Sequence, residues 1–255
     1  MITVRPAIRF GRRFCPPPSW PSNTWQIYSS DYDTAAAYYA VKKACEPVHA
    51  QLNLPDFAPA VANISRVAQP HLSLRTRIVS LDNRLLAQRV DPVNVGANSV
   101  ETLAPLNLAP LLAHEALAIV KLTLTDSRGT TLSDNVYWQG RDAASQRRLL
   151  DLPAQAVAVT ARARKVGAET HVDVLLTNQG RAPALAAKIT MLDERGARVL
   201  PVYYDDNYIA LLPGESRRIE VLCPAGAARC ARVALRGWNV AGRDIAVEAA
   251  APISD

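Results

Sequence analysis

The chain has 255 residues, of which 49% are hydrophobic and 20% are charged, a composition typical of a globular protein long enough for two domains. This balance excludes an intrinsically disordered chain, and no apolar run reaches the roughly 18 residues that a membrane-spanning helix needs. The net charge of +6 comes from 29 Lys and Arg against 23 Asp and Glu, and the basic residues are scattered rather than grouped with aromatic residues. We therefore expect no nucleic-acid partner and no membrane span.

Residues 1–18 form an atypical leader. The stretch "MITVRPAIRFGRRF" is positively charged but contains no apolar segment, so as it stands it is not a secretory signal. The next stretch, "WPSNTWQIYSSDYDTAAAYYAVKKACEP", predicts a loop followed by a helix from about Thr34 to Cys45. Pro47 ends this helix because proline cannot continue the helical hydrogen bonding.

The acidic residues around this helix have ordinary structural explanations. Asp31 and Asp33 precede the helix, where a carboxylate caps free backbone N–H groups and interacts favourably with the helix dipole. We therefore predict capping rather than catalysis for this pair. Glu46 follows the helix, and we expect it to form an ion pair with Lys42 or Lys43.

From about residue 50 onward the sequence is typical of short β-strands. Apolar side chains recur at every second position in short blocks, a period that predicts half-buried antiparallel strands. The alternating positions are Leu72, Leu74, Thr76 and Ile78; Leu122 and Leu124; Val157, Val159 and Ala161; Val172, Val174 and Leu176; Ile219 and Val221; Val233 and Leu235. Turn signals lie between the blocks at "LDNR", "DSRG", "TNQG", "DERG" and "LPGES". We predict an all-β sandwich fold.

A weak internal repeat indicates two such sandwiches in tandem. "LRTRIVSLDNR" (residues 74–84) aligns with "LAAKITMLDER" (residues 185–195), and "GANSVETL" aligns with "PGESRRIEVL". The offset of about 111 residues is the length of one immunoglobulin-like domain. We expect a first sandwich at 50–140, a linker at 141–152 and a second sandwich at 153–250. Within "GRDAASQRRLLDLP" the "RRLL" stretch predicts one helical turn before Pro153 requires an extended chain.

The four cysteines show no metal-binding spacing. Cys15, Cys45, Cys223 and Cys230 form no CxxC and accompany no histidine at a ligand spacing. Cys223 and Cys230 flank the turn "PAGAAR", so they either face each other and oxidise in a secretory compartment or remain two semi-buried thiols. No GxSxG, HExxH, P-loop or GxGxxG motif is present, and we expect neither a metal nor a cofactor.

Acidic residues in the strand region repeat a pattern between the two halves. Asp205 and Asp206 are adjacent in "YYDDNY", where side chains diverge instead of meeting at one substrate atom. Asp134 and Asn135 in "SDNVYW" occupy a similar place in the first half. We interpret both as one repeated structural device, and we assign no catalytic residue to this chain.

Aromatic residues can stack on sugars, but those in the strands have a simpler explanation. We expect them to pack in the sandwich cores and at domain interfaces. They are Tyr137, Trp138, Tyr203, Tyr204, Tyr208 and Trp238.

Several long motifs resemble one enzyme family. "WPSNTWQIYSSDYDTAAAYYAVKKACEPVHAQLNL", "SDNVYWQG", "PVYYDDNYIALLPGESRRIEV" and "LRGWN" are similar to the carboxy-terminal part of glycoside hydrolase family 2. The resemblance is to the subgroup of exo-β-D-glucosaminidases, β-mannosidases and mannosylglycoprotein endo-β-mannosidases, and it extends from about Pro18 to Asn239. It implies two tandem immunoglobulin-like sandwiches preceded by the end of a catalytic (β/α)8 barrel, with residues 19–49 as the last barrel loop, the last barrel helix and its exit.

The resemblance also implies where chemistry would be expected. Retaining glycosidases need two carboxyl groups about 5 to 5.5 Å apart. In the family both lie on barrel strands that would precede Met1, so we expect no hydrolysis by this chain alone. Residues 1–18 do not resemble the eighth barrel strand, and we expect a truncated or frame-shifted reading frame, or a gene fragment with a new start. Trp20 and Trp25 would line the substrate pocket only if the barrel were present.

The family interpretation has further consequences. Without the barrel, the helix would expose Tyr38, Tyr39 and Val41 as an apolar patch. The expected partner is the catalytic barrel. The sequence does not choose between a mannoside and a glucosaminide substrate, and we expect a periplasmic or secreted parent enzyme.

Two alternatives remain open. The first is a carbohydrate-binding module that uses Trp138 or Trp238 to hold a β-linked glycan. The second is one half of a split glycosidase whose barrel is a separate polypeptide, with the two associating through the helix from Thr34 to Cys45.

Overall fold

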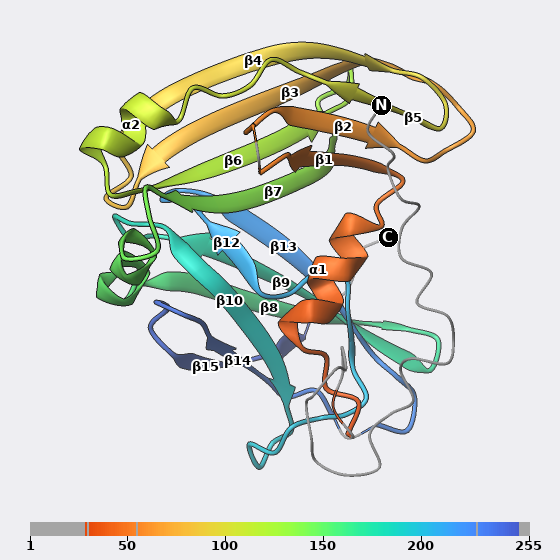
Figure 1. Cartoon of the computed structure of the whole chain (residues 1–255). Coiled ribbons are helices and arrows are strands. Elements are labelled where there is room, and N and C mark those ends of the chain that lie inside the picture. The colour runs from red at the N-terminus through yellow and green to blue at the C-terminus, as the bar shows by residue number, and fades with distance from the viewer. Residues whose placement is uncertain (1–28, 30, 55, 228, 250–255) are drawn as a thin grey trace. The chain divides into compact units, whose positions relative to one another are not determined.

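The computed structural model describes residue 29 and residues 31–54, 56–227 and 229–249 (Figure 1). Two compact units divide the chain, one formed by residues 42–153 and the other by residues up to 41 together with 154 onward. Helix α1 (Ala36–Ala44) spans the division between the units. Each unit is described separately below.

The unit of residues 42–153 is a β-sandwich of two antiparallel sheets. One sheet has the strand order β1-β2-β5, and the other has the order β4-β3-β6-β7. The strands are β1 (Val48–Leu52), β2 (Pro59–Asn63), β3 (Gln69–Ser80), β4 (Leu85–Val95), β5 (Ser99–Thr102), β6 (Leu117–Thr125) and β7 (Thr131–Gly140). A short helix α2 (Ala109–His114) precedes β6, and the 3-10 helix η1 (Ser145–Asp151) follows β7.

The core of this first sandwich lies between its two sheets. Ala50, Leu52 and Val61 from one sheet join Leu74 and Leu122 from the other in a single buried cluster. The alternation predicted in β3 is confirmed, since its inward positions are buried while its neighbours are more exposed. The predicted turn at "RRLL" is also confirmed, because it lies inside η1.

The second unit is a larger β-sandwich. Its sheets have the strand orders β12-β10-β14-β15 and β11-β13-β9-β8-β16. The strands are β8 (Val157–Val166), β9 (Glu169–Asn178), β10 (Ala184–Leu192), β11 (Tyr203–Tyr204), β12 (Ile209–Leu211), β13 (Ser216–Cys223), β14 (Arg232–Arg236), β15 (Arg243–Ala246) and β16 (Glu248–Ala249). The all-β prediction is confirmed in both units.

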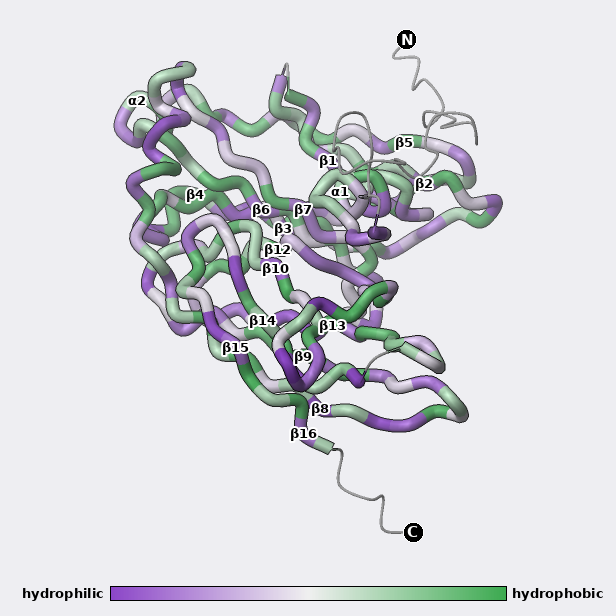
Figure 2. The backbone as a smooth tube through the Cα atoms, turned by 90° about the horizontal axis from the view of Figure 1, so that it is seen from below, coloured by the Kyte–Doolittle hydropathy of each residue, from purple (hydrophilic) through white to green (hydrophobic). Residues whose placement is uncertain are grey.

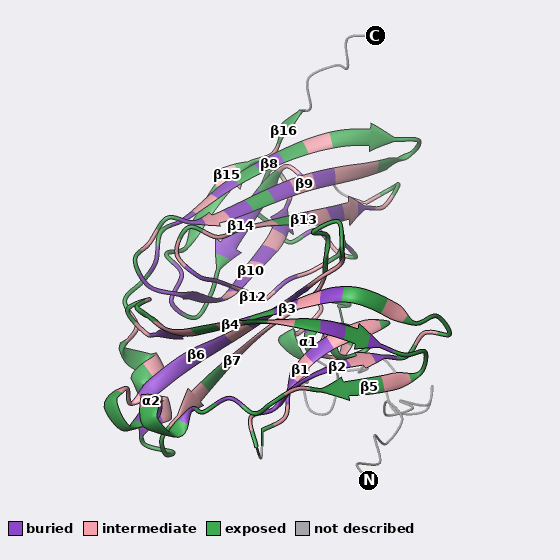
Figure 3. Ribbon diagram, turned by 90° about the horizontal axis from the view of Figure 1, so that it is seen from above, coloured by how far each residue is buried: buried purple, intermediate pink, exposed green. Residues whose placement is uncertain are grey.

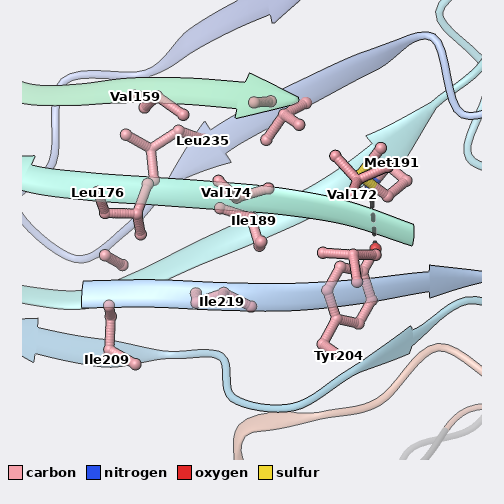
Figure 4. Packing of buried hydrophobic residues seen from close by; sticks show 14 of the residues in the cluster. Val159, Val172, Val174, Leu176, Ile189, Met191, Tyr204, Ile209, Ile219 and Leu235 are labelled. Carbon is pink, nitrogen blue, oxygen red and sulfur yellow. Dashed lines mark hydrogen bonds between the residues drawn. The ribbon is translucent and has the colours of Figure 1, made fainter. Parts of the chain in front are cut away.

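The sequence period of two explains how the second sandwich forms. Figure 2 shows hydrophobic and hydrophilic residues alternating along the chain, and Figure 3 shows buried positions alternating with more exposed ones along β9. Because successive strand residues point to opposite faces, each sheet obtains one apolar face. These faces meet in a core that contains Val174, Ile189, Met191, Ile219 and Leu235 (Figure 4).

Two of the predicted turn signals, one in each sandwich, form the same kind of turn. In "DSRG" the carboxylate of Asp126 accepts hydrogen bonds from the backbone N–H groups two and four residues later, and Asp193 does the same in "DERG". Gly129 and Gly196 both have a φ of 82°, a left-handed conformation that glycine adopts without strain. The same side chain and the same glycine therefore close both turns.

Cys223 and Cys230 form a disulfide, which decides between the two alternatives that the sequence left open. The bond joins the end of β13 to the residues before β14, and both cysteines are buried. Cys45 is an exposed free thiol. Among the described residues, no helix is both long and apolar enough to cross a membrane.

The predicted apolar patch on α1 is wrong. Tyr39 is only 4% exposed and belongs to the core cluster of the second sandwich, and Tyr38 packs against the same cluster. Val41 is half-buried. The helix therefore buries its aromatic side chains in a sandwich that begins more than one hundred residues later in the chain, a contact that local sequence patterns do not reveal.

Candidate functional site

The acidic pair before α1 binds cations of the second sandwich. The guanidinium of Arg198 donates to Asp31 Oδ2 at 2.6 Å and to Asp33 Oδ2 at 3.1 Å. Lys188 Nζ on β10 donates to the same Asp33 oxygen at 3.1 Å. Helix α1 begins at Ala36, beyond both aspartates, so the prediction that they cap the helix is wrong. They form a four-residue ion-pair network instead.

Aromatic side chains surround this network. Lys188 Nζ lies 5.3 Å from the ring centre of Tyr208, a cation–π distance, and the Tyr208 ring lies 5.9 Å from that of Tyr39. The hydroxyl groups of Thr34 and Tyr39 are hydrogen-bonded at 2.7 Å. We define the aspartate cluster as Asp31, Asp33, Lys188 and Arg198 together with these three residues.

The pKa shifts of Asp31 and Lys188 favour the charged forms of both side chains. The hydrogen bond from Ser29 Oγ is the main cause that lowers the pKa of Asp31; burial opposes it, and Arg198 adds to it. Burial opposes the charge of Lys188, but Tyr208 and Asp33 outweigh it and raise the pKa of this lysine. Burial also raises the pKa of Tyr39 to about 12. At neutral pH Asp31 is an anion that pairs with Arg198, and Lys188 is a cation that pairs with Asp33.

The lowered carboxyl pKa values do not suit the general acid/base residue of a glycosidase. The acid/base residue of such an enzyme must hold a proton near neutral pH, which requires a raised carboxyl pKa. Every carboxyl group among the described residues with a resolved shift has a lowered pKa: Asp31, Asp82, Asp126, Asp142 and Glu220. No group of three or more His, Cys, Asp or Glu side chains within this part of the chain could hold a metal ion.

In the first sandwich, side chains of β7 hold the backbone of β1. Ala50 N–H donates to Ser133 Oγ at 3.1 Å, and Asn135 Nδ2 donates to the Ala50 carbonyl at 2.6 Å. Two residues further, Leu52 N–H donates to the Tyr137 hydroxyl at 3.2 Å. These side chains satisfy backbone groups on the edge of β1 that no neighbouring strand pairs.

The second sandwich repeats this arrangement on β10. Asn207 accepts from Ile189 N–H at 2.8 Å and donates to the Ile189 carbonyl at 2.9 Å. Two residues further, Met191 N–H donates to the Tyr204 hydroxyl at 2.9 Å (Figure 4). An asparagine and a tyrosine thus hold one strand edge in each sandwich, although their order in "SDNVYW" is the reverse of that in "YYDDNY". We call the two sets the β1 clamp and the β10 clamp.

The remaining acidic candidates also have structural partners. Asp205 Oδ1 accepts from Glu220 N–H at 2.9 Å, and Asp206 Oδ2 pairs with Arg217 at 2.7 Å. Asp134 pairs with Lys43 at 3.0 Å. The lysine that we expected for Glu46 is therefore not Lys43.

Glu46 itself takes part in holding β1. Its Oε2 atom accepts from Ser133 Oγ at 2.6 Å and lies 3.1 Å from His49 Nδ1. Because Ser133 also accepts from the backbone of β1, Glu46 fixes the orientation of that hydroxyl. The glutamate therefore connects the end of α1 to the β1 clamp.

The aromatic residues divide into two groups. Tyr204 is buried, and Tyr137 and Tyr208 are half-buried, as expected for packing residues. Trp138, Tyr203 and Trp238 are 47%, 59% and 58% exposed, so the expectation of core packing is wrong for these three. Trp20 and Trp25, the predicted substrate-lining residues, lie outside the described residues.

A shallow depression lies beside the disulfide of the second sandwich. Its charged lining residues are all basic, namely Arg164, Lys165 and Arg229. Arg164 pairs with Glu220 at 2.6 Å and Arg229 with Glu194 at 2.8 Å. Most of this positive charge is therefore already neutralised, and the depression offers no catalytic group.

Sequence reasoning missed Lys188 and Arg198. Neither residue carries a signal that pairs it with the aspartates, although Lys188 lies inside the repeat segment "LAAKITMLDER", and the partner of each lies more than 150 residues away. Only the fold brings these residues to the acidic pair. The clamp residues, by contrast, repeat between the halves, and that repeat was the available signal.

Two family models match the chain. Residues 60–140 match a mannosidase Ig/CBM-like domain, and residues 135–240 match the Ig-fold domain of exo-β-D-glucosaminidase. These stretches correspond to the two sandwiches, so both are immunoglobulin-like domains.

Longer proteins are similar to most of the chain. The exo-β-D-glucosaminidase of Streptomyces avermitilis is 28% identical over 89% of this chain, which is 28% of the relative. The mannosylglycoprotein endo-β-mannosidase of Lilium longiflorum is 23% identical over 86% of the chain and 30% of the relative. The crystal structure of the Amycolatopsis orientalis exo-chitosanase CsxA matches with a TM-score of 0.79 and 27% identity, over 89% of this chain and 30% of that one. The chain therefore spans less than a third of the length of these proteins.

Proposed function

We propose that this chain is the non-catalytic sandwich region that supports the catalytic barrel of a glycoside hydrolase family 2 enzyme. Its two immunoglobulin-like domains match those of the exo-β-D-glucosaminidase and mannosidase group, and this match is the premise of the proposal. Its role is to pack against the barrel. The barrel supplies the two carboxyl groups of a retaining mechanism.

The observation that carries this proposal is the state of the aspartate cluster. Asp31 and Asp33 are closely spaced carboxylates within residues 19–49, the segment that resembles the end of a barrel. Arg198 binds both of them, and Lys188 is a second cation on Asp33. A nucleophile must reach the sugar, and a general acid must hold a proton. Asp31 and Asp33 are bound to side chains of the second sandwich, and the lowered pKa of Asp31 keeps it from holding the proton that a general acid needs.

The similarities support one substrate class for the parent enzyme. We propose a β-linked glucosaminide, because the Streptomyces and Amycolatopsis proteins carry that activity in their names and match at higher identity than the lily mannosidase. The Cys223–Cys230 disulfide supports a periplasmic or secreted parent, since such bonds form in oxidising compartments.

The supporting role can be tested in the Amycolatopsis exo-chitosanase. Removing its matched region should lower both its melting temperature and its hydrolysis of a β-D-glucosaminide, because the barrel loses a packing surface. Fusing the present chain in that place should restore part of both. A truncated enzyme as stable and as active as the intact one would contradict the proposed role.

A second candidate function is glycan binding, and the exposure of Trp138 favours it. Titration of the chain with chitosan oligosaccharides in a calorimeter distinguishes the two functions. The supporting role predicts no saturable heat. A binding module predicts saturable heat that Trp138→Ala removes while the circular dichroism spectrum stays unchanged, with Trp238→Ala as the matched substitution in the other sandwich.

A further inference from the structure

Residues 31–39, which we call the strap, lie on the second sandwich although the first sandwich follows them in sequence. The strap is held at its start by Arg198 and Lys188 through Asp31 and Asp33. At its end Tyr39 enters the core of the second sandwich. Two different kinds of interaction, ionic and apolar, therefore fix the strap at both ends.

The middle of the strap connects these two ends. Tyr208 Oη donates to the Thr34 carbonyl at 3.5 Å, and the Thr34 hydroxyl is bonded to Tyr39. Lys188 lies between Asp33 and the Tyr208 ring, so one lysine contacts both the ionic and the aromatic part. Loss of the ionic contacts should therefore loosen the aromatic ones as well.

The backbone at the strap is held in an unusual conformation. Tyr32 has a φ of 65° and Tyr208 a φ of 54°, values that cost free energy for residues other than glycine. Such conformations persist where the surrounding contacts determine them. The position of the strap is thus set by the second sandwich.

We propose that the strap is a latch that fixes the preceding polypeptide to the second sandwich. On the proposed function, from which this inference follows, the second sandwich is then the part of the region that anchors the catalytic barrel through the strap. The latch consists of two carboxylates, Asp31 and Asp33, which bind Arg198 and Lys188 of the second sandwich. The buried Tyr39 follows them in the sequence.

Hydrogen exchange of the whole chain tests this latch. Arg198→Met removes two ionic contacts, so the amides of residues 38–41 should exchange about five to ten times faster. About 0.5 M NaCl should accelerate the same amides in the wild type, because it screens the ion pairs, and should change the variant less. The matched control is Arg229→Met, which removes an exposed ion pair with Glu194 in the same unit and should leave the strap unchanged.

The amides of β9 report whether the variants remain folded. Protection of Val172, Val174 and Leu176 should equal that of the wild type in both variants. Unchanged exchange at residues 38–41 in Arg198→Met would overturn the latch, and so would an equal loss of protection in the strap and in β9. Glycoside hydrolysis or glycan binding by the chain would refute the proposed function and leave these exchange results unaffected.

Discussion

At the scale of single residues, the two clamps show how side chains replace missing strand neighbours. Tyr204 accepts the N–H of Met191 inside the second sandwich, and both residues are buried. Burial raises the pKa of Tyr204 above its ordinary value, so the phenol stays neutral. A buried backbone N–H without an acceptor is costly, which explains why a tyrosine rather than a phenylalanine occupies this place.

Removing this hydroxyl should destabilise the second sandwich. Tyr204→Phe leaves the Met191 N–H without its acceptor, and we expect a loss of about 1 to 3 kcal/mol in the free energy of unfolding, measured in urea. The matched control is the neighbouring Tyr203→Phe, whose ring is exposed and which should change stability by less than about 0.5 kcal/mol. Equal effects of the two substitutions would show that the clamp hydrogen bond adds nothing.

The charge of Asp31 should appear in the acid stability of the protein. Its pKa is lowered in the folded chain, chiefly by Ser29 and also by Arg198, so the ionised form favours folding. That contribution is complete above about pH 4, the unfolded value, and disappears as the pH falls through the folded-state pKa. In Asp31→Asn, the decline of stability between neutral pH and pH 2 should be shallower than in the wild type. Identical slopes in thermal melts across this range would contradict the assignment.

At the scale of elements, the disulfide fixes the end of β13 beside the start of β14. The two cysteines are seven positions apart, so the bond closes a short loop and restricts the unfolded chain. A loop of this size corresponds to a stabilisation of about 2 kcal/mol.

Replacing both cysteines by serine should lower the free energy of unfolding by about that amount. Dithiothreitol should lower the melting temperature of the wild type but not that of the double variant. The free thiol of Cys45 provides the control, because Cys45→Ser leaves the disulfide intact and should retain the wild-type response. A wild-type melting temperature insensitive to the reductant, with the bond shown to be reduced, would contradict this role.

Much of the element structure was predictable from the sequence. The period of two in stretches such as Val172, Val174 and Leu176 predicted strands, because it reflects which face of a sheet is buried. The turns at "DSRG" and "DERG" were predictable because each carries its own turn-forming residues. The binding of Asp31 by Arg198 was not predictable, since it depends on the tertiary path of the chain and leaves no periodic signal.

The exposed tryptophans show a second limit of sequence reasoning. Trp138 lies in β7 on the solvent side, and an aromatic side chain alone does not reveal which face of a strand it occupies. The helix α1 shows the same limit in the opposite direction, because Tyr39 was expected to be exposed and is buried.

At the scale of the whole molecule, the chain has two cores that belong to two units. One cluster contains only residues of 42–153, and the other combines Tyr39 with the strands after residue 153. A change in one core should therefore affect one unit more than the other.

Tyr39→Ala tests this division. The substitution removes a buried ring, so the second sandwich should lose about 3 kcal/mol of stability. Native-state hydrogen exchange should show faster opening of β9 and β13, whereas β3 and β6 in the first sandwich should retain their protection. Equal loss of protection in both sandwiches would show that the chain unfolds as one cooperative unit.

The central claim is that these two sandwiches supply structure and not the chemistry of glycoside cleavage. Release of p-nitrophenol from p-nitrophenyl β-D-glucosaminide by the purified chain measures this most directly, with Asp31→Asn/Asp33→Asn as the matched variant. The account predicts a rate equal to that of buffer for both proteins, because the aspartate cluster is neutralised by Arg198 and Lys188. Turnover by the wild type that the double substitution removes would contradict it.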